Sequence, residues 1–338
     1  MTTPGIGTLI VVDVAFGDAS VEHAVAGESG LAVRYCPGID LDDPAFADPS
    51  VVGVLVRRRP IDADAIARMP HIRVIGRYGT GVDGLDVPAA QAAGIAIVSV
   101  PDYCAEEVGQ HALALLLSAW RRIGASTRYD EHDPWTAVRS IGEIRPLSQC
   151  TLGIVGSGRT GGELARQAAP LFSRICMWDP RRPAPPGTHA AASLSGLLRA
   201  CDVVSLHCPL TDETRGMLDA EMLAQMRAGS LLVNAARGEI VDANALLDGL
   251  DSGRPAAAAL DVLGTADADL RERFRAHPAV TVTPHLAWYS TRSLQRLRQE
   301  VTRRCAAVVI SAQATPDTTD AAPVRSGVRV RGRRPEHA

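Results

Sequence analysis

The sequence predicts an α/β fold with two domains and parallel sheets. A chain of 338 residues, 46% hydrophobic and 22% charged, is long enough for its core to divide in two. Short apolar runs alternate with helical stretches, which is the β-α-β rhythm of a parallel sheet. The rhythm runs through two series, separated by a polar stretch that contains Pro134 and Trp135.

The first series begins with an apolar run over residues 8–16. No basic segment precedes this run and no small-residue cleavage site follows it, so it indicates a strand and not a signal peptide. A long helix is expected at residues 105–122, with acids in its first turn and arginines in its last. Its most apolar part is too short to cross a bilayer. The expected strands are residues 9–14, 51–56, 74–75 and 95–98.

The second series contains six expected strands, the number in a complete dinucleotide-binding sheet. A last helix is expected at residues 290–310. The tail, residues 312–338, has few apolar residues and is expected to be disordered. The six strands are residues 151–155, 175–178, 203–206, 231–234, 257–260 and 280–283.

Composition argues for a small-molecule ligand. The net charge is -3 and the pI is about 6.3, so no field of one sign attracts nucleic acid or an anionic membrane. Seven cysteines are scattered without metal-binding spacing, which predicts a reducing, cytoplasmic location and no metal site. All 35 basic residues are arginine, so lysine is excluded as a catalyst.

A glycine-rich loop follows the strand at residues 151–155. Gly156 suits a tight turn, Gly158 allows a pyrophosphate to approach the backbone, and Gly161 allows close packing of helix on strand. The phosphates would bind to free amides at the helix N-terminus, where Arg159 and Thr160 lie. Such loops also occur in methyltransferases, so the motif alone is weak.

Asp179, at the end of the next strand, strengthens the interpretation. A carboxylate there accepts hydrogen bonds from the adenosine ribose and repels a 2′-phosphate, which favours NAD over NADP. Arg181 and Arg182 soften this preference slightly. The glycine loop lies near residue 156, so something precedes the cofactor domain.

Four further stretches, in this order around the glycine loop, are residues 76–83 (GRYGTGVD), 202–210 (DVVSLHCPL), 234–238 (NAARG) and 283–285 (TPH). With the loop, they make the chain resemble the D-2-hydroxyacid dehydrogenases over about residues 50–310. Residues 284–290 (PHLAWYS) and Arg77-Tyr78-Gly79 resemble the branch that includes the C-terminal-binding-protein corepressors.

This resemblance implies how the domains are organised. A Rossmann-type NAD-binding domain, residues 104–285, would be inserted into a split, flavodoxin-like substrate domain. That outer domain would consist of residues 1–103 and 286–311. Two subunits would pair through their cofactor domains as a homodimer.

The chemistry can be argued from the residues. Reduction of a 2-keto acid needs a cation that orients the carboxylate and polarises the carbonyl, and an acid that protonates the forming alkoxide. Arg237 and His285 both follow strands, at the sheet edge where ligands bind, and are the candidates for these two roles. Arg237 could instead cap a helix or pair with Asp242, and a lone histidine is more often structural.

Other residues are assigned to substrate. The amides of the loop Gly79-Thr80-Gly81 could hold the substrate carboxylate, with help from Arg77. By resemblance, Trp288 would wall the pocket, although a core or interface tryptophan is an alternative.

The resemblance also implies further cofactor contacts. Asp261 would lie near the nicotinamide carboxamide, and a loop after the strand at 203–206 would pass beneath the adenine and ribose. The residues concerned, beside those above, are His207, Cys208, Pro209, Thr214, Ala235, Ala236, Arg237, Asp261 and His285.

The sequence departs from the family at the usual catalytic glutamate. That position is Ala266, so the carboxylate that normally stabilises the protonated histidine is missing. Asp267 or Asp269 could substitute if the loop is rearranged. Ser99 also replaces an asparagine that many members carry.

We therefore expect an NAD-dependent oxidoreductase that interconverts a 2-keto acid and a D-2-hydroxy acid. One alternative is a dimeric, NAD(H)-sensing, corepressor-like protein with weak or lost catalysis. Another is a dehydrogenase of a different small anion, such as a phosphonate or phosphite.

Overall fold

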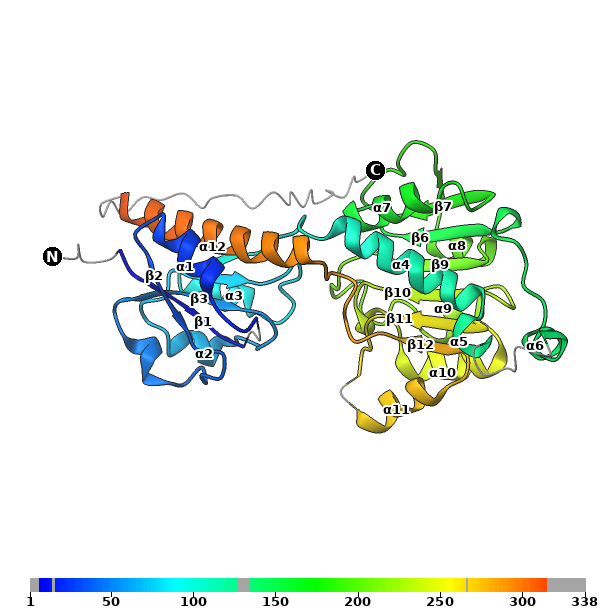
Figure 1. Ribbon diagram of the computed structural model, residues 1–338, viewed down its shortest axis with the longest axis horizontal. Coiled ribbons are helices and arrows are strands. Elements are labelled where there is room, and N and C mark those ends of the chain that lie inside the picture. The colour runs from blue at the N-terminus through cyan, green and yellow to red at the C-terminus, as the bar shows by residue number, and fades with distance from the viewer. Residues whose placement is uncertain (1–5, 14–15, 127–133, 266, 315–338) are drawn as a thin grey trace, which may run out of the picture.

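The protein is built on two parallel β-sheets, each with helices packed against it (Figure 1). The computed structural model describes residues 6–13, 16–126, 134–265 and 267–314. The first sheet has the strand order β2-β1-β3-β4-β5, and the second the order β12-β11-β10-β9-β6-β7-β8. All neighbouring strands in both sheets pair in parallel. The expected α/β class is therefore confirmed.

Each sheet contains a point where the strand order reverses. In the first sheet the order is that of flavodoxin, and the reversal falls between β1 and β3. In the second sheet it falls between β6 and β9. Ligands of open α/β sheets bind outside the carboxyl ends of the strands at such points, because the crossovers on either side leave a crevice there.

The strands of the first sheet are β1 (Thr8–Val11), β2 (Ala32–Tyr35), β3 (Val51–Val56), β4 (Val74–Arg77) and β5 (Ala96–Val98). Those of the second are β6 (Thr151–Val155), β7 (Arg174–Trp178), β8 (His189–Ala190), β9 (Val203–Leu206), β10 (Leu231–Asn234), β11 (Ala257–Leu260) and β12 (Val280–Val282).

The helices up to the glycine loop are α1 (Ser20–Gly27), α2 (Ala63–Ala67), α3 (Val87–Ala92), α4 (Ala105–Trp120), α5 (Ile123–Ser126) and α6 (Pro134–Ile141). Those after it are α7 (Arg159–Ala168), α8 (Leu194–Ala200), α9 (Ala220–Ala224), α10 (Ala243–Ser252), α11 (Ala268–Ala276) and α12 (Thr291–Ala314). Three 3-10 turns occur at Pro44–Ala47, Leu147–Gln149 and Gly238–Ile240.

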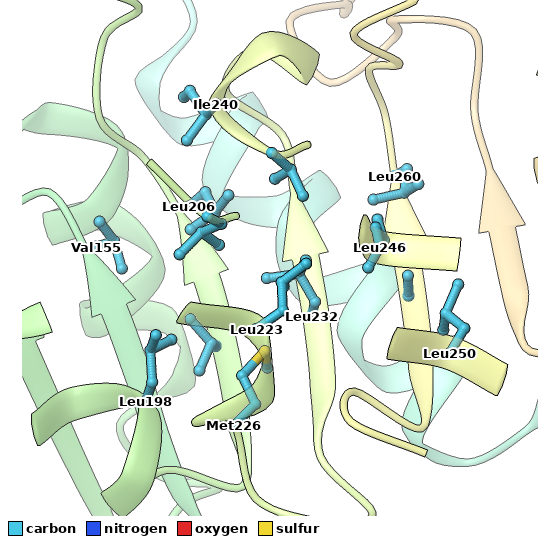
Figure 2. Close-up of a cluster of buried hydrophobic side chains, with 14 of the residues drawn as sticks. Val155, Leu198, Leu206, Leu223, Met226, Leu232, Ile240, Leu246, Leu250 and Leu260 are labelled. Carbon is cyan, nitrogen blue, oxygen red and sulfur yellow. The ribbon is translucent and has the colours of Figure 1, made fainter. Parts of the chain in front are cut away.

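The second sheet is covered by a layer of leucine-rich helices, α8, α9 and α10 (Figure 2). Side chains from five parallel strands meet side chains from these helices, and nearly all are fully buried. Because both faces of such strands are covered, they consist of continuous apolar runs. The labelled members in Figure 2 are Val155, Leu198, Leu206, Leu223, Met226, Leu232, Ile240, Leu246, Leu250 and Leu260.

Helix α12 returns to the first sheet, where it packs on α1, β3 and β4 (Figure 1). A buried ion pair joins the two helices: Nη2 of Arg298 lies 2.6 Å from Oε2 of Glu22, which is fully buried. The hydroxyl of Tyr78 donates to the same carboxylate at 2.9 Å. This network ties the C-terminal helix to the strand end that carries Arg77.

The structure corrects several expected boundaries. The strand expected at residues 9–14 ends at Val11, and β2 and β8 were not expected. Helix α12 continues to Ala314, so the expected disorder is wrong for residues 312–314, while 315–338 lie outside the described residues. Among the helices that the structure describes, none is long and apolar enough to span a membrane.

Candidate active site

The polar residues that the sequence singles out gather around one cavity of about 770 Å³. Most of them follow directly on strands, because the carboxyl ends of the parallel strands of each sheet share one edge. The first sheet contributes the ends of β3 and β4, and the second the ends of β6, β7, β9, β10, β11 and β12. The cavity therefore opens at the switch points of both sheets.

The glycine loop has the geometry that a dinucleotide needs. Gly156 has φ +103°, and a Cβ there would lie 2.8 Å from the carbonyl carbon of His207. A Cβ on Gly161 would overlap the carbonyl oxygen of Gly156. A Cβ on Gly158 would approach only the end of the Arg182 side chain, at 3.2 Å. The backbone beside Gly158 is therefore open to a pyrophosphate at the N-terminus of α7.

Asp179 follows β7 and lies beside the glycine loop. One of its oxygens accepts a hydrogen bond from the amide of Ser157 at 2.8 Å, and the other accepts from those of Arg181 and Arg182 at 2.9 and 3.1 Å. The carboxylate lines the cavity. Since each oxygen has two lone-pair sites, the oxygen that accepts only from Ser157 keeps acceptor capacity for a ribose hydroxyl.

The loop after β9 lies opposite the glycine loop. Nε2 of His207 contacts Oγ of Ser205 at 2.9 Å, while its Nδ1 is buried without a partner in the described part of the chain. Burial lowers the pKa of His207 to about 4, so the ring is neutral. Thr214 holds the loop by donating from its hydroxyl to the carbonyl of Pro209 at 2.7 Å. Burial raises the pKa of Cys208 to about 11, which keeps it a thiol.

Arg237 is presented by a short turn that Asn234 fixes. The side chain of Asn234 is buried, donates to the carbonyl of Arg237 at 2.9 Å and accepts from the amide of Ala236 at 3.0 Å. Arg237 itself donates from Nη1 to the carbonyl of Ala236 at 2.8 Å. The turn thus aims the guanidinium into the cavity.

The partner of Arg237 is Asp83 and not Asp242. Nε and Nη2 of Arg237 donate to Oδ1 of Asp83 at 3.3 and 3.2 Å. Burial opposes ionisation of Asp83, but the charge and hydrogen bonds of Arg237 keep its pKa below the usual value. Asp242 instead caps α10. The alternative pairing is therefore wrong, and Arg237 links the two sheets.

The loop after β4 supplies free backbone donors. Gly79 has φ +152°, which favours glycine, and its carbonyl accepts from the amide of Val100 at 2.9 Å. The hydroxyl of Thr80 donates to the carbonyl of Val100 at 3.3 Å. Within the described residues, the amides of Thr80 and Gly81 have no protein acceptor, and both residues line the cavity. A ligand carboxylate would satisfy them.

His285 enters the cavity from the residues after β12. Its φ of +58° is unusual for a non-glycine residue. Its amide donates to the carbonyl of Asp261 at 2.9 Å, which holds the backbone in place. Burial lowers the pKa of His285, and nearby arginines, chiefly Arg237, act in the same direction, whereas Asp261 raises it.

Asp261 organises the backbone around His285. Its buried carboxylate accepts from the hydroxyl of Thr283 at 2.6 Å and from the amides of Leu286 and Ala287 at 2.8 and 2.9 Å. Nε2 of His111, on α4, lies 3.3 Å from the same carboxylate. Asp261 lines the cavity at the expected nicotinamide site. Its carboxylate already contacts four donor groups of the protein.

Trp288 lies on the cavity wall. Its Nε1 donates to the carbonyl of His285 at 2.9 Å, and the guanidinium of Arg57 lies over its ring, 4.8 Å from the centroid. Tyr103 packs beside it, with ring centroids 6.3 Å apart. The tryptophan is therefore both part of the pocket and packed against the first-sheet core.

The two expected substitutes for the missing glutamate, Asp267 and Asp269, lie at the start of α11. Asp267 caps α11 by accepting from the amides of Asp269 and Leu270 at 2.9 and 3.2 Å. Neither aspartate borders the cavity in the part of the chain that is described. Ala266 itself lies outside the described residues. Asp261 is the carboxylate that raises the pKa of His285.

Apart from Gly161, which packs helix on strand, every residue assigned to cofactor or substrate borders the cavity. Several neighbours of the site were given no role from the sequence, and some of them have partners that are distant in the chain. Arg237 and Asp83, for example, are 154 positions apart. The missed residues are Arg57, Arg58, Asp83, Tyr103, His111 and Asn234.

The cavity thus joins a dinucleotide-type loop to an arginine, free backbone amides and a histidine. Residues 113–287 match the family model for the D-isomer specific 2-hydroxyacid dehydrogenase, NAD binding domain. The chain belongs to the D-isomer specific 2-hydroxyacid dehydrogenase family.

Two named proteins are similar to this chain over most of its length. The chain is 35% identical over 302 residues to the D-3-phosphoglycerate dehydrogenase of Mycobacterium tuberculosis, an alignment that covers 87% of this chain and 56% of that protein. It is 31% identical over 257 residues to the hydroxypyruvate reductase of Thermotoga maritima, covering 75% of this chain and 83% of that protein. The chain thus spans about half the length of the mycobacterial relative.

A solved structure of a Thermus thermophilus protein superimposes with a TM-score of 0.78 at 31% identity. The match covers 90% of this chain and 97% of that one. The arrangement of both sheets is therefore shared with a protein of known structure.

Proposed function

We propose that this chain is an NAD-dependent oxidoreductase that interconverts a 2-keto acid and a D-2-hydroxy acid. The observation that carries the proposal is the single cavity in which the glycine loop and Asp179 meet Arg237, His285 and the free amides. A cofactor held by the loop at one end would meet a small acid held at the other.

Substrate binding would use Arg237 and the loop after β4. The amides of Thr80 and Gly81 would receive the carboxylate, while the fork of Arg237 orients it and polarises the keto oxygen. Asp83 holds the guanidinium in place through Nε and Nη2. Such fixed donors stabilise charge that develops on the oxygen without having to reorganise.

His285 would supply and accept the proton. When bound, NADH supplies a hydride to the keto carbon. The protonated imidazole of His285 gives its proton to the oxygen as charge develops there, and takes it back in the oxidation. Because burial lowers its pKa, the ring is neutral over more of the physiological range than a free histidine.

Asp179 supports NAD as the cofactor. Its carboxylate lies where the adenosine ribose would bind, and a 2′-phosphate would meet its charge. Arg181 and Arg182 flank it, but Arg181 pairs with Glu213. The selectivity for NAD therefore depends on Asp179.

We also propose the domain boundaries and a cytoplasmic homodimer. Residues 104–285 would form the cofactor domain, and residues 1–103 with 286–311 the substrate domain. The packing of α12 on α1, β3 and β4 supports this division. Exposed Trp135 and Val138 on α6 support pairing through the cofactor domain.

A second candidate function, NAD(H) sensing in a corepressor-like protein, rests on residues 284–290 and Arg77-Tyr78-Gly79, which resemble that branch. The two named relatives described above are a dehydrogenase and a reductase by name, which favours catalysis.

A purified chain tests the proposal when NADH consumption is followed with a panel of 2-keto acids. Turnover should be lost in His285→Ala and strongly reduced in Arg237→Lys, which keeps the charge but not the bidentate fork. An unchanged rate in either variant would remove that residue from the chemistry.

A further inference from the structure

His111 lies on α4 and contacts two residues that surround His285. Its Nε2 lies 3.0 Å from Oγ1 of Thr283 and 3.3 Å from Oδ1 of Asp261. Thr283 follows β12 and Asp261 follows β11, and α4 packs on both of these strands. His111 itself does not border the cavity, so any effect that it has on the reaction must pass through these neighbours.

Asp261 is an ionised carboxylate with one basic neighbour. Its side chain is fully buried, and in the described part of the chain no basic side chain other than His111 lies within ion-pair distance of it. Burial opposes the ionisation of Asp261, but hydrogen bonds, first that of His111 and then that of Thr283, keep its pKa below the usual value. His111 is therefore the main group that keeps this buried carboxylate charged.

The available hydrogen atoms decide which group donates to which. The hydroxyl of Thr283 lies 2.6 Å from Oδ1 of Asp261, and an ionised carboxylate can only accept. The single hydroxyl hydrogen therefore goes to Asp261, and Oγ1 of Thr283 accepts from His111. It follows that Nε2 of His111 carries a hydrogen, which the oxygens of Thr283 and Asp261 share.

Asp261 in turn shapes the segment that carries His285. Its carboxylate accepts from the amides of Leu286 and Ala287, and its carbonyl accepts from the amide of His285. These bonds support the left-handed backbone of His285, a conformation that a non-glycine residue keeps only when its surroundings hold it. Without the donor of His111, the carboxylate would turn or take up a proton, and either change weakens this support.

Asp261 also acts on the imidazole of His285 by its charge. The charged groups that face this imidazole are Asp261, Arg237, Arg58 and Arg57. The arginines oppose protonation of His285 and stay charged throughout the pH range of an assay, whereas Asp261 favours protonation. The usual glutamate position is Ala266, so the support that Asp261 gives to a protonated His285 carries more weight in this chain.

We propose that His111 is a positioning residue for His285 and that it acts through Asp261. The N–H at Nε2 of His111 holds the carboxylate where it fixes the backbone beside His285, and it preserves the negative charge that stabilises the protonated imidazole. The inference rests on the proposed function, and it adds to the reaction a residue that lies outside the cavity.

Two variants of similar helix propensity test this role. His111→Leu removes the donor, whereas His111→Gln keeps an N–H at a similar reach. His111→Leu should lower reductive kcat about 10- to 100-fold, the cost of a misplaced catalytic group, while KM for the keto acid and Kd for NADH stay close to the parent values. His111→Gln should recover most of the lost kcat. An unchanged kcat in His111→Leu, or equal losses in the two variants, overturns the proposal.

His71→Leu is the matched control for the same chemical change. His71 is exposed and does not border the cavity, so this substitution should leave kcat and Tm unchanged. Tm is measured for all variants, and kinetics are compared well below the lowest Tm, so that partial unfolding does not enter the comparison.

An NMR titration separates this inference from the proposed function. If the parent chain reduces no keto acid, the proposed function fails, yet the pKa of His285 can still be followed through its Hε1 signal, assigned by comparison with His285→Ala. Both variants at His111 are neutral, so a difference between them reports the donor alone. The pKa of His285 should be lower in His111→Leu than in His111→Gln, because a less ionised Asp261 supports the imidazolium less. Equal pKa values in the two variants overturn the proposal, even where kcat falls.

Discussion

An alanine at position 81 would bring its Cβ into overlap with Nη2 of Arg237 and with Oδ1 of Asp83. Both atoms are ends of side chains, so the overlap can be relieved by moving the guanidinium away from the substrate site. The pair is partly exposed, with 26% and 37% of the two side chains accessible, so losing it should cost less than about 1 kcal/mol of folding stability.

Catalysis should be affected far more. A displacement of about 1 Å at a positioned group can cost about 10²-fold, which corresponds to about 2.7 kcal/mol of transition-state stabilisation. We therefore expect Gly81→Ala to lower kcat/KM for the best 2-keto acid about 100-fold, with a nearly unchanged Tm.

Two other glycines provide controls for Gly81→Ala. Gly84 lies in the same loop with open space around its Cα, so Gly84→Ala should leave both kcat/KM and Tm unchanged. A Cβ on Gly238 would overlap the backbone of Gly264, which cannot rotate away, so Gly238→Ala should lower Tm clearly. If Gly81→Ala retains full kcat/KM, the role given to Arg237 is wrong.

Three further predictions concern cofactor selectivity, the pH dependence of reduction and the stability of the fold. Asp179→Ala should weaken NADH binding much more than NADPH binding in fluorescence titrations; an equal loss for both would contradict the selectivity assigned to Asp179. Because burial lowers the pKa of His285 and reduction needs its protonated form, reductive kcat/KM should fall as pH rises through a value below the usual histidine pKa. Ala266→Glu should move this limb of the pH profile upward, and an unmoved limb would show that proton supply does not limit the rate. Arg298→Met leaves the fully buried Glu22 without its guanidinium and should lower the free energy of unfolding in urea by about 3 to 5 kcal/mol; a loss below about 1 kcal/mol would refute the buried pair.

Continuous apolar runs made most of the fold predictable from the sequence. All six expected strands of the second sheet are present. The inner ones are easiest to predict, because strands covered on both faces are apolar throughout. The missed strands, β2 and β8, lie at sheet edges, where at least one residue is exposed and the apolar pattern is lost.

The site was predictable where function depends on local motifs at strand ends. The glycine loop, Arg237 and His285 each follow an apolar run, so their shared edge could be inferred from the sequence. The partners of these residues could not be inferred in this way. Asp83 and His111 reach the site from segments more than 150 positions away, and no local pattern encodes such a contact.

The arginines after β3 are a second case in which the sequence does not reveal which residues border the cavity. A charged run that follows a strand usually indicates a solvated turn, and Arg59 fits that description through its pair with Asp40. Arg57 and Arg58 differ because Asp13 holds their backbone against the cavity. Only the pairing of β1 with β3 brings these residues together.

The central claim, that this cavity joins a nicotinamide cofactor to a D-2-hydroxy acid, is tested most directly in the oxidative direction. The D and L enantiomers of the hydroxy acid that corresponds to the best keto substrate are supplied separately with NAD, and NADH formation is measured. We predict turnover of the D enantiomer that depends on His285, with little from the L enantiomer. Preference for the L enantiomer, or NADH formation that survives in His285→Ala, would contradict the account.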